Sequence, residues 1–331
     1  MGFRHLSLAL AGVALSAAAA VAQPKPAVVF DMGGKFDKSF NEGVFNGVER
    51  FKKETGIDYA EFEVTNPSQR EQALRNFARR GNDPILAVGF AQADALEKVA
   101  KEFPNIKFSI IDGVVELPNV QSILFKEHEG SYLVGVLSAL ASKSGKVGFI
   151  GGMDIPLIRK FACGYAQGVK AAKPSAEIFQ NMTGTTPAAW RDPVKGGELA
   201  KSQIDRGADV IYAAAGGTGI GVLQTAADNG KLGVGVDSNQ NHLHPGKVLT
   251  SMLKRVDTAA YGAFMAAKNN SFKAGFNNLG LAEDGVGWAL DDNNKALVTD
   301  DMKKAVDQAS ADIKSGKIKV HDYMADSKCP I

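Results

Sequence analysis

Three aspartates each stand directly after a run of apolar residues that is typical of a buried strand. Asp31 follows Val-Val-Phe, Asp112 follows Ser-Ile-Ile, and Asp237 follows Gly-Val-Gly-Val. One such aspartate is commonly a turn former or a helix cap, but three at equivalent positions favour a shared task. An ionised carboxylate only accepts hydrogen bonds, so this set suits a ligand rich in N–H and O–H donors. It would also suit a divalent cation, although no Asp-x-Asp or Glu-x-x-His spacing supports a metal.

Other motifs indicate less chemistry. A glycine-rich segment follows an apolar run, as a phosphate-binding turn would: Gly216-Gly217-Thr218-Gly219-Ile220-Gly221. The spacing of its glycines matches neither the dinucleotide-binding motif nor the P-loop. Backbone packing is therefore favoured there. His242 and His244 stand beside a Pro-Gly turn, which is more typical of a solvated loop than of a metal pair. Gly-x-Ser-x-Gly is absent, so we predict no catalytic residue, no metal site and no cofactor.

Composition narrows the class of protein. The chain has 331 residues, of which 45% are hydrophobic and 22% charged, as in ordinary globular proteins. This length favours two lobes over one, because a single hydrophobic core usually stops growing near this size. Lys and Arg number 38 and Asp and Glu 36, a formal charge of +2, and these charges are dispersed along the chain. Such dispersal argues against a nucleic-acid partner.

The N-terminus has the pattern of an export signal. Arg4 and His5 form a short basic start, residues 6–20 are mostly apolar and uncharged, and Ala20-Val21-Ala22 fits a signal-peptidase site. We predict a signal peptide over residues 1–22, with cleavage before Gln23. The apolar run is short for a membrane anchor and is followed directly by a polar segment containing proline. Because no cysteine stands at the cleavage point, we expect no lipid attachment there.

The two cysteines of the chain, Cys163 and Cys329, would both reach an oxidising compartment after export, so a disulfide between them is possible. Cys163 lies in a helical pattern and Cys329 almost at the chain end. The sequence therefore leaves their pairing open.

Strand and helix patterns alternate along the chain. The first half has strand patterns over 27–31, 59–64, 85–89 and 106–112, with helix patterns over 39–54, 69–80 and 93–103. The pattern then restarts with helices over 131–142, 157–172, 196–206 and 220–229, and strands over 146–151, 177–182, 209–215 and 233–237. Ser39-Phe40-Asn41-Glu42 has the spacing of a capping box at the first helix.

Continuous apolar strands separated by helices favour parallel sheets covered on both faces. We therefore predict an α/β protein of two doubly wound lobes. Such lobes bind ligands outside the carboxyl ends of their strands, which is where the three aspartates stand.

Several segments together resemble one family. They are Asp37-Lys38-Ser39-Phe40-Asn41, Glu129-Gly130-Ser131, Ile150-Gly151-Gly152-Met153 with Pro156, Ala215-Gly216-Gly217-Thr218-Gly219, Val236-Asp237-Ser238 and Thr250-Ser251-Met252-Leu253-Lys254. In this order they resemble the basic membrane protein family, the purine-nucleoside-receptor-type substrate-binding proteins of ABC importers. The resemblance covers most of the mature chain.

The resemblance implies a type I periplasmic-binding-protein fold that clamps its ligand in the cleft between two lobes. Lobe one would comprise residues 24–125 plus about 253–280, and lobe two residues 126–252 plus about 281–331. The family commonly carries a lipid-anchored cysteine, which this sequence lacks at its N-terminus. We therefore expect a monomer that diffuses freely in a Gram-negative periplasm and meets an ABC permease in the inner membrane.

The resemblance also implies roles for single residues. Asp31, Asn41 and Asp112 would hydrogen-bond the edge of a base, and Phe40 would stack on its face. Asp237 would hold the ribose hydroxyls.

Two further residues would lie alongside Asp237, namely Lys254 and the turn at Gly217. Lys254 would offset the cost of burying several acids in one cleft. A second aromatic would come from the other lobe, and Tyr212 and Trp190 both qualify.

The function implied by the resemblance is capture of a purine nucleoside, or a related nucleobase compound, for an ABC importer. The alternatives are a binder of a free purine base or another aromatic heterocycle and, from another class, a periplasmic nucleoside hydrolase or an NAD-type oxidoreductase.

Overall fold

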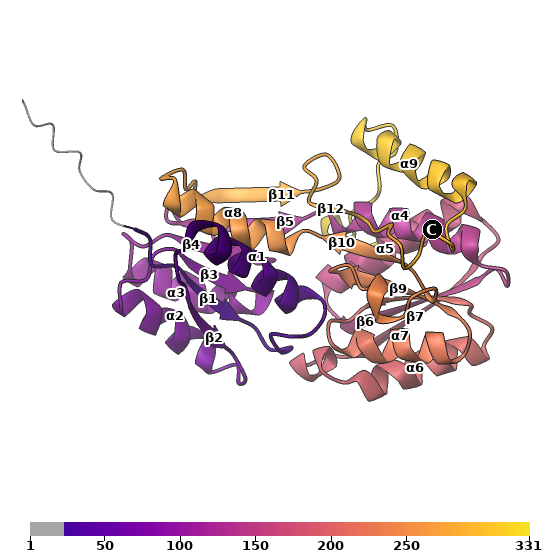
Figure 1. The fold of residues 1–331 in the computed structure, drawn as a ribbon, viewed down its shortest axis with the longest axis horizontal. Coiled ribbons are helices and arrows are strands. Elements are labelled where there is room, and N and C mark those ends of the chain that lie inside the picture. Colours follow the sequence, from indigo (N-terminus) through magenta and orange to yellow (C-terminus); the bar gives the residue numbers. More distant parts are fainter. Residues whose placement is uncertain (1–22) are drawn as a thin grey trace, which may run out of the picture.

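The computed structural model describes residues 23–331, and its strands form two sheets in two lobes that lie side by side along the longest axis (Figure 1). The predicted signal peptide, residues 1–22, lies outside the described residues. From residue 23 onward, no helix is both long and apolar enough to cross a membrane.

The first sheet is parallel throughout, in the order β11-β5-β4-β3-β1-β2. Its strands are β1 (Ala27–Phe30), β2 (Ala60–Glu63), β3 (Ile85–Val88), β4 (Phe108–Ile111), β5 (Val120–Phe125) and β11 (Gly275–Leu279). The helices of this lobe are α1 (Phe40–Thr55), α2 (Gln69–Arg79), α3 (Ala93–Glu102) and α8 (Val256–Lys268).

Alternation along β1 explains how helices cover both faces of this sheet. Val28 and Phe30 belong to the same hydrophobic cluster as the apolar residues of α1 and α8. Ala27 and Val29 belong to the cluster formed with α2 and α3. Since successive side chains of a strand point to opposite faces, an uninterrupted apolar strand needs a helix layer on each side.

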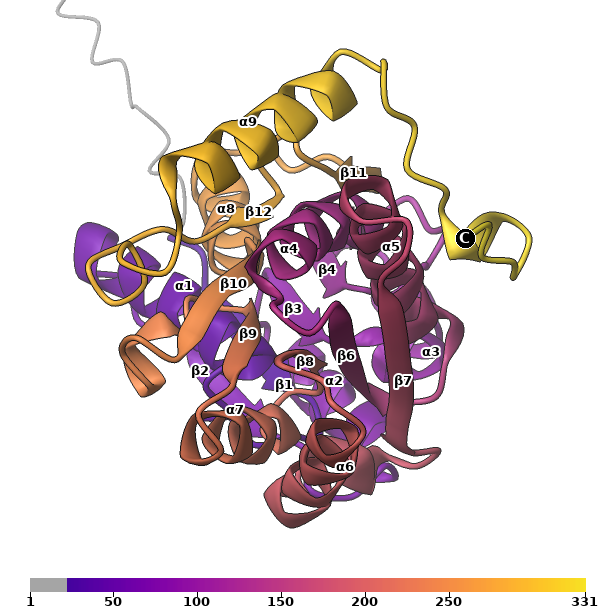
Figure 2. The same cartoon turned by 90° about the vertical axis from the view of Figure 1, so that its right-hand side faces the viewer.

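The second sheet has the order β12-β10-β9-β8-β6-β7 and is parallel except for β12, which pairs antiparallel with β10. Its strands are β6 (Lys146–Met153), β7 (Glu177–Gly184), β8 (Val210–Ala214), β9 (Leu232–Asp237), β10 (Val248–Lys254) and β12 (Val286–Trp288). The helices are α4 (Glu127–Ala141), α5 (Pro156–Ala172), α6 (Pro193–Asp205), α7 (Thr218–Asp228) and α9 (Asp300–Lys314). Figure 2 shows α4 and α5 on one side of the sheet and α6 and α7 on the other, with α9 over α4.

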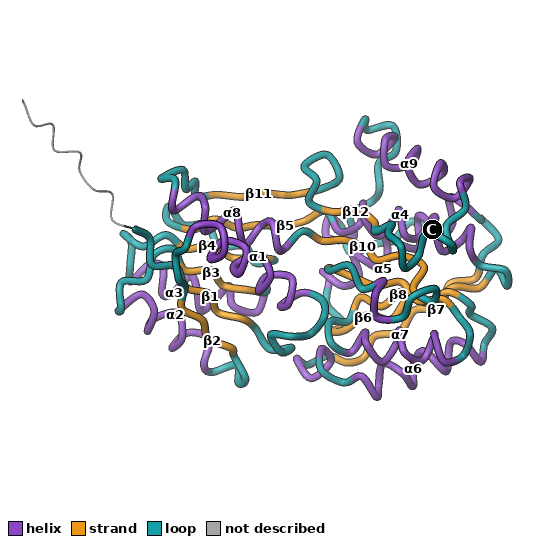
Figure 3. Tube along the Cα trace, in the orientation of Figure 1, coloured by secondary structure: helices purple, strands orange, loops and turns teal. Residues whose placement is uncertain are grey.

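The chain passes between the sheets three times: from β5 into α4, from β10 into α8, and from β11 to β12 (Figure 3). We propose that the lobe boundaries lie at these passages. On this division β10 belongs to the second sheet up to Lys254, two residues beyond the range predicted for lobe two.

Cys163 of α5 and Cys329 form a disulfide, with their Cα atoms 5.5 Å apart. The pairing that the sequence left open is therefore present. It holds the C-terminal segment against α5, where the side-chain amide of Gln167 also donates a hydrogen bond of 3.0 Å to the carbonyl oxygen of His321.

The predicted alternation of strands and helices is confirmed, and most predicted ends agree within a few residues. One difference matters for the site. The helix predicted from residue 131 begins at Glu127, so the first turn of α4 lies directly beside the passage between the lobes.

Candidate ligand-binding site

The cleft between the lobes holds a cavity of about 650 Å³, including its open mouth. The carboxyl ends of β1 and β4 reach it from the first lobe and the end of β9 from the second. Seven of the nine residues predicted for the site line it: Asp31, Phe40, Asn41, Asp112, Trp190, Asp237 and Lys254. Tyr212 and Gly217 are not among the lining residues.

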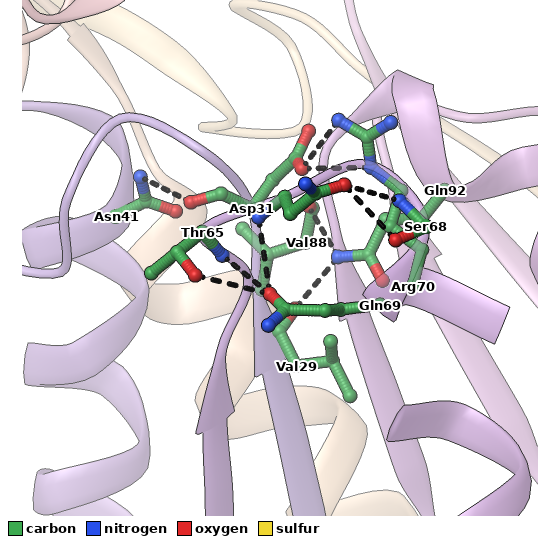
Figure 4. Close-up of polar contacts among 10 residues, drawn as sticks. Val29, Asp31, Asn41, Thr65, Ser68, Gln69, Arg70, Val88 and Gln92 are labelled. Carbon is green, nitrogen blue, oxygen red and sulfur yellow. Dashed lines mark hydrogen bonds and ion pairs between the residues drawn. The ribbon is translucent and has the colours of Figure 1, made fainter. Parts of the chain in front are cut away.

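Asp31 stands immediately after β1 and is paired with Arg70 of α2, as Figure 4 shows. Arg70 donates from Nε at 3.0 Å and from Nη2 at 2.9 Å, both to the Oδ1 atom of Asp31. Burial raises the pKa of Asp31, and the charge of Arg70 offsets part of that rise. Arg70 thus compensates the charge of the partly buried Asp31 carboxylate, and it does so through Oδ1 alone.

Asn41 lies in the first turn of α1 and is oriented by the backbone. Its Nδ2 donates to the carbonyl oxygens of Asp31 at 3.4 Å and Gly34 at 3.3 Å (Figure 4 shows the contact with Asp31). Its Oδ1 is buried and has no hydrogen-bond partner among residues 23–331. A buried acceptor without a partner costs free energy, so this oxygen calls for an N–H or O–H donor from a ligand.

Asp37, which the sequence analysis did not select, caps α1. Its carboxylate accepts hydrogen bonds from the backbone N–H groups of Ser39 (2.9 Å), Asn41 (3.0 Å) and Glu42 (3.1 Å). The predicted capping box is therefore wrong: Ser39 makes no side-chain cap, because its hydroxyl points to the other lobe. Burial raises the pKa of Asp37 to about 7 despite these three donors.

Asp112 and Asp237 both adopt the left-handed backbone conformation, with φ angles of 65° and 62°. This region is uncommon for residues other than glycine, and such strain concentrates at functional sites. Burial raises the pKa of both carboxyls, and the Lys254 ammonium offsets part of each rise. Two strained, buried acids from opposite lobes thus face the same cleft.

The oxygens of these two acids have different partners. The Oδ2 atom of Asp112 accepts a hydrogen bond of 2.6 Å from Lys254 Nζ, while its Oδ1 is buried with no partner among the described residues. The Oδ2 atom of Asp237 accepts from the Ser39 hydroxyl at 2.5 Å, across the cleft. Asp112 therefore offers a second orphaned acceptor to a ligand, close to a fixed positive charge.

Lys254 itself is nearly inaccessible to solvent, with 2% of its side chain exposed. Its ammonium also pairs with Glu127 Oε1 at 2.9 Å, and Glu127 Oε2 lies 2.9 Å from Lys160 Nζ. Glu127, Lys160 and Arg70 were missed by sequence reasoning. The one available signal was the charged pair Lys126-Glu127, which follows the last residue of β5, Phe125.

Aromatic side chains reach the cavity from both lobes. Phe40 comes from the start of α1 and Trp190 from the loop between β7 and α6. The Trp190 ring lies on the backbone of Gly152, where an added Cβ would stand only 2.1 Å from Trp190 Cζ3. The absence of a side chain at Gly152 thus sets the position of the indole.

Two predicted site residues are corrected. Tyr212 is fully buried within β8; its hydroxyl lies 3.4 Å from Ser131 Oγ and its ring meets Phe149 edge-on. It packs in the core because its strand position faces α4 and α5 rather than the cleft. At the glycine turn Gly216 lines the cavity and Gly217 does not; a Cβ on Gly217 would stand 3.2 Å from the Trp190 carbonyl oxygen.

Residues with orphaned acceptor oxygens and two aromatic residues line the same cavity, together with four acids and Lys254, and Arg70 pairs with one of these acids. The cavity therefore suits a flat, neutral molecule that carries N–H and O–H donors. The buried carboxylates disfavour a phosphorylated ligand by like-charge repulsion.

Comparisons with known proteins show which family and fold this chain resembles. The family described as ABC transporter substrate-binding protein PnrA-like matches residues 25–323. A relative named ABC transporter nucleoside-binding protein BmpA, from Lactococcus lactis subsp. cremoris, is 32% identical over 320 residues, covering 89% of this chain and 88% of that protein. A protein of Pyrococcus furiosus named as an uncharacterized lipoprotein is 36% identical over 288 residues, covering 81% of this chain and 70% of its own length.

Among solved structures, a solute-binding protein of an ABC transporter system from Aeropyrum pernix superposes with a TM-score of 0.81 at 28% identity. The match covers 89% of this chain and 93% of that one. The α/β fold of two lobes with parallel sheets is thus the fold of the solute-binding proteins.

Proposed function

Because the chain belongs to the family of PnrA-like ABC transporter substrate-binding proteins, we propose that it captures a purine nucleoside and delivers it to an ABC importer. Membership makes it an extracytoplasmic solute-binding protein with a small-molecule ligand and an ABC permease as partner. The nucleoside, the periplasmic location and the monomeric state are parts of the proposal.

The observation that carries the proposal is the pair of orphaned acceptors, Asn41 Oδ1 and Asp112 Oδ1, at a cavity lined by aromatic rings. A purine supplies ring N–H and exocyclic amine donors for such oxygens and a flat face for the rings. Stacking on an aromatic side chain contributes about 1–3 kcal/mol per base. The name of the Lactococcus relative, a nucleoside-binding protein, points to the same ligand class.

The sugar of the ligand is assigned to the second lobe. Asp237 lines the cavity and uses its Oδ2 for Ser39, so Oδ1 would accept from a ribose hydroxyl. Phe40 would stack on one face of the base and Trp190 would cover the other. Closing the two lobes over the ligand would bring both sets of contacts together.

We also propose that the mature protein diffuses freely in the periplasm. Some relatives are named lipoproteins, but within residues 23–331 of this chain both cysteines form the disulfide, which leaves no thiol to acylate. Mass spectrometry of the exported protein tests this: the expected mass is that of a chain beginning at Gln23. A larger mass that matches an acylated chain would contradict it.

A ligand screen tests the nucleoside assignment. The melting temperature of the protein should rise with inosine, guanosine or adenosine, because a ligand that binds only the folded state stabilises it by mass action. Free sugars and nucleotides should give no shift. A shift with free bases that equals the shift with nucleosides would favour the alternative, a binder of a purine base.

The rival enzyme class is tested in the same samples. Inosine in molar excess over the protein is incubated with it and analysed for released hypoxanthine. We expect inosine to be recovered intact. Release of the base at a rate proportional to protein concentration would establish a hydrolase instead.

A further inference from the structure

Behind the cleft, four buried side chains form a row of alternating charge. Asp112 Oδ2 lies 2.6 Å from Lys254 Nζ, Lys254 Nζ lies 2.9 Å from Glu127 Oε1, and Glu127 Oε2 lies 2.9 Å from Lys160 Nζ. Their side chains are 8% exposed or less. The row contains two acids and two bases, so its formal charges cancel.

Each member comes from a different element. Asp112 follows β4 of the first lobe, Lys254 ends β10 of the second, Glu127 is the first residue of α4, and Lys160 lies in α5. Glu127 and Lys254 therefore stand at two of the three passages between the lobes. Lys160 is itself anchored, because its ammonium donates a hydrogen bond of 2.7 Å to the carbonyl oxygen of Phe125.

Lys254 is shared between two carboxylates, Asp112 and Glu127, and only Asp112 lines the cavity. If Glu127 had no other cation, it would draw the ammonium away from Asp112, since a buried carboxylate must be compensated. Lys160 supplies that second cation. The availability of Lys254 to Asp112 thus depends on a residue that does not touch the cleft.

We infer that Glu127 and Lys160 are positioning residues for the ligand site: Lys160 neutralises Glu127, which leaves the Lys254 ammonium to hold Asp112 as an ionised acceptor for the ligand. This inference rests on the proposed function, because Asp112 is taken to accept a hydrogen bond from the base. Lys160 acts on Asp112 only through Glu127.

The other charged groups facing the row are Asp237, which acts on Asp112 and Lys254, and Asp322 and His128 beside Lys160. Asp322 Oδ2 lies 3.6 Å from Lys160 Nζ and a third of its side chain is exposed. Burial and the nearby charge of Lys160 lower the pKa of His128 to about 4, below the pKa of about 6 to which burial raises Asp112. Neither neighbour replaces Glu127 as the partner of Lys160.

Two substitutions, one at Glu127 and one at Lys160, should shift the titration midpoint of Asp112 in opposite directions. In Glu127→Gln, Lys254 no longer shares its ammonium with a second carboxylate, and a negative charge near Asp112 is lost. The titration midpoint of Asp112 should therefore move to lower pH. In Lys160→Met, Glu127 competes for Lys254, so the midpoint should move to higher pH. Each displacement should be on the order of one pH unit.

The midpoint is measured directly on ligand-free protein, by following the carboxyl carbon of Asp112 in NMR spectra between pH 4 and 8, with Asp112→Asn to assign the signal. Inosine affinity is then measured by calorimetry over the same range. At a pH below the midpoint, affinity should fall about tenfold per pH unit, so Lys160→Met should bind about tenfold more weakly than wild type at acid pH.

The double variant, Glu127→Gln with Lys160→Met, tests the order of action. It removes one acid and one base, so it should fold even if a single variant with an unpaired buried charge does not. Its midpoint should equal that of Glu127→Gln. Lys160→Arg should keep the wild-type midpoint, and so should Lys146→Met, which removes an exposed lysine paired with Glu177 in the same lobe.

Midpoints that move in the same direction in both single variants, or do not move at all, would overturn the inference, as would a double variant that resembles Lys160→Met. The NMR measurement needs no ligand. If no nucleoside binds at any pH, the proposed function fails while the titration still decides the roles of Glu127 and Lys160.

Discussion

At the scale of single residues, the carboxylates of the cleft differ in their hydrogen-bond and ion-pair partners. Asp31 is paired with an arginine, Asp112 with a lysine, and Asp237 accepts from the hydroxyl of Ser39 on the opposite lobe. Asp37 accepts only backbone N–H groups. Because each acid has its own compensation, substitutions at these positions should have separable effects on the base, the sugar and stability.

Asp237→Ala should weaken nucleoside binding by roughly ten- to a hundredfold, because the ribose hydroxyls lose a buried acceptor at about 1–3 kcal/mol. Binding of the free base should barely change. Asp112→Ala, the control, should weaken nucleoside and base together. Calorimetric titration of the two variants with inosine and hypoxanthine distinguishes these cases; equal losses for both ligands in Asp237→Ala would contradict the ribose assignment.

Asp37 should make stability depend on pH. Burial raises its pKa from the ordinary value of 3.8 to about 7 in the folded protein. A raised pKa means that the folded state holds the proton more tightly, so this contribution to stability is complete below pH 3.8 and is lost as pH rises through 7. Between pH 4 and 7, wild type should therefore lose stability relative to Asp37→Asn, by at most about 1.4 kcal/mol per pH unit.

Urea unfolding of wild type and Asp37→Asn at half-unit pH steps measures this difference. It should level off above pH 8, where Asp37 is ionised in both the folded and unfolded states. A difference that does not vary with pH would mean that Asp37 is ionised throughout the range.

At the scale of elements, α4 and α5 approach one another through glycines. A Cβ on Gly135 of α4 would stand 2.3 Å from the carbonyl oxygen of Tyr165, and one on Gly168 of α5 would stand 2.0 Å from that of Tyr132. Both contacts are with backbone, which cannot move aside as a side chain can. This pair of helices positions Glu127 and Lys160, so its close packing supports the row of charges behind the cleft.

Gly168→Ala should therefore destabilise the protein by about 1–3 kcal/mol, the usual cost of overpacking. The matched control is Gly262→Ala in α8, where an added Cβ meets nothing within 4 Å. That substitution should stabilise the protein by up to about 1 kcal/mol, because alanine has the higher helix propensity. Thermal unfolding of both variants measures the contrast; stabilisation of both would show that α4 and α5 can separate at no cost.

At the scale of the whole molecule, the loop before α1 joins the two lobes. The Ser39 hydroxyl donates to Asp237 Oδ2, the Ser238 hydroxyl donates to the Ser39 carbonyl oxygen at 2.8 Å, and the Gln240 side-chain amide donates to the Lys38 carbonyl oxygen at 3.0 Å. These bonds span the cleft from the first lobe to the β9 end of the second. They would favour the closed arrangement of the lobes over an open one.

Ser238→Ala should speed ligand release without removing a cavity-lining residue. Loss of one hydrogen bond worth about 1 kcal/mol should raise the dissociation rate by roughly two- to tenfold, with little change in association. Stopped-flow fluorescence of Trp190 measures both rates. Ser271→Ala, which removes a hydroxyl contact within one lobe, is the control and should leave both rates unchanged.

Much of the fold follows from local pattern. Uninterrupted apolar strands such as residues 27–30, followed by amphipathic helices, predict parallel sheets covered on both faces, and the structure has them. Four strands were not predicted: β5 and β10, which lie inside the sheets, and β11 and β12, which lie at their edges, and the helices α8 and α9 were not predicted either. Low burial explains the weak hydrophobic signal of β11, but β5 and β10 are mostly buried apolar strands, so their omission has no such reason.

The sequence by itself predicted the acids at the strand ends: Asp31 and Asp112 share one sheet edge, because the carboxyl ends of parallel strands meet there, and Asp237 ends a strand of the other lobe. Phe40 and Asn41 were predicted from the resemblance of residues 37–41 to the family's motif. Only the tertiary structure decided that Asp37 caps α1, that Trp190 lines the cavity while Tyr212 lies in the core, and that Cys163 reaches Cys329. It alone brought Glu127 and Lys160 behind Lys254. The physical reason is that these contacts join residues far apart in the chain, and a contact of that kind depends on how the layers pack and not on local periodicity.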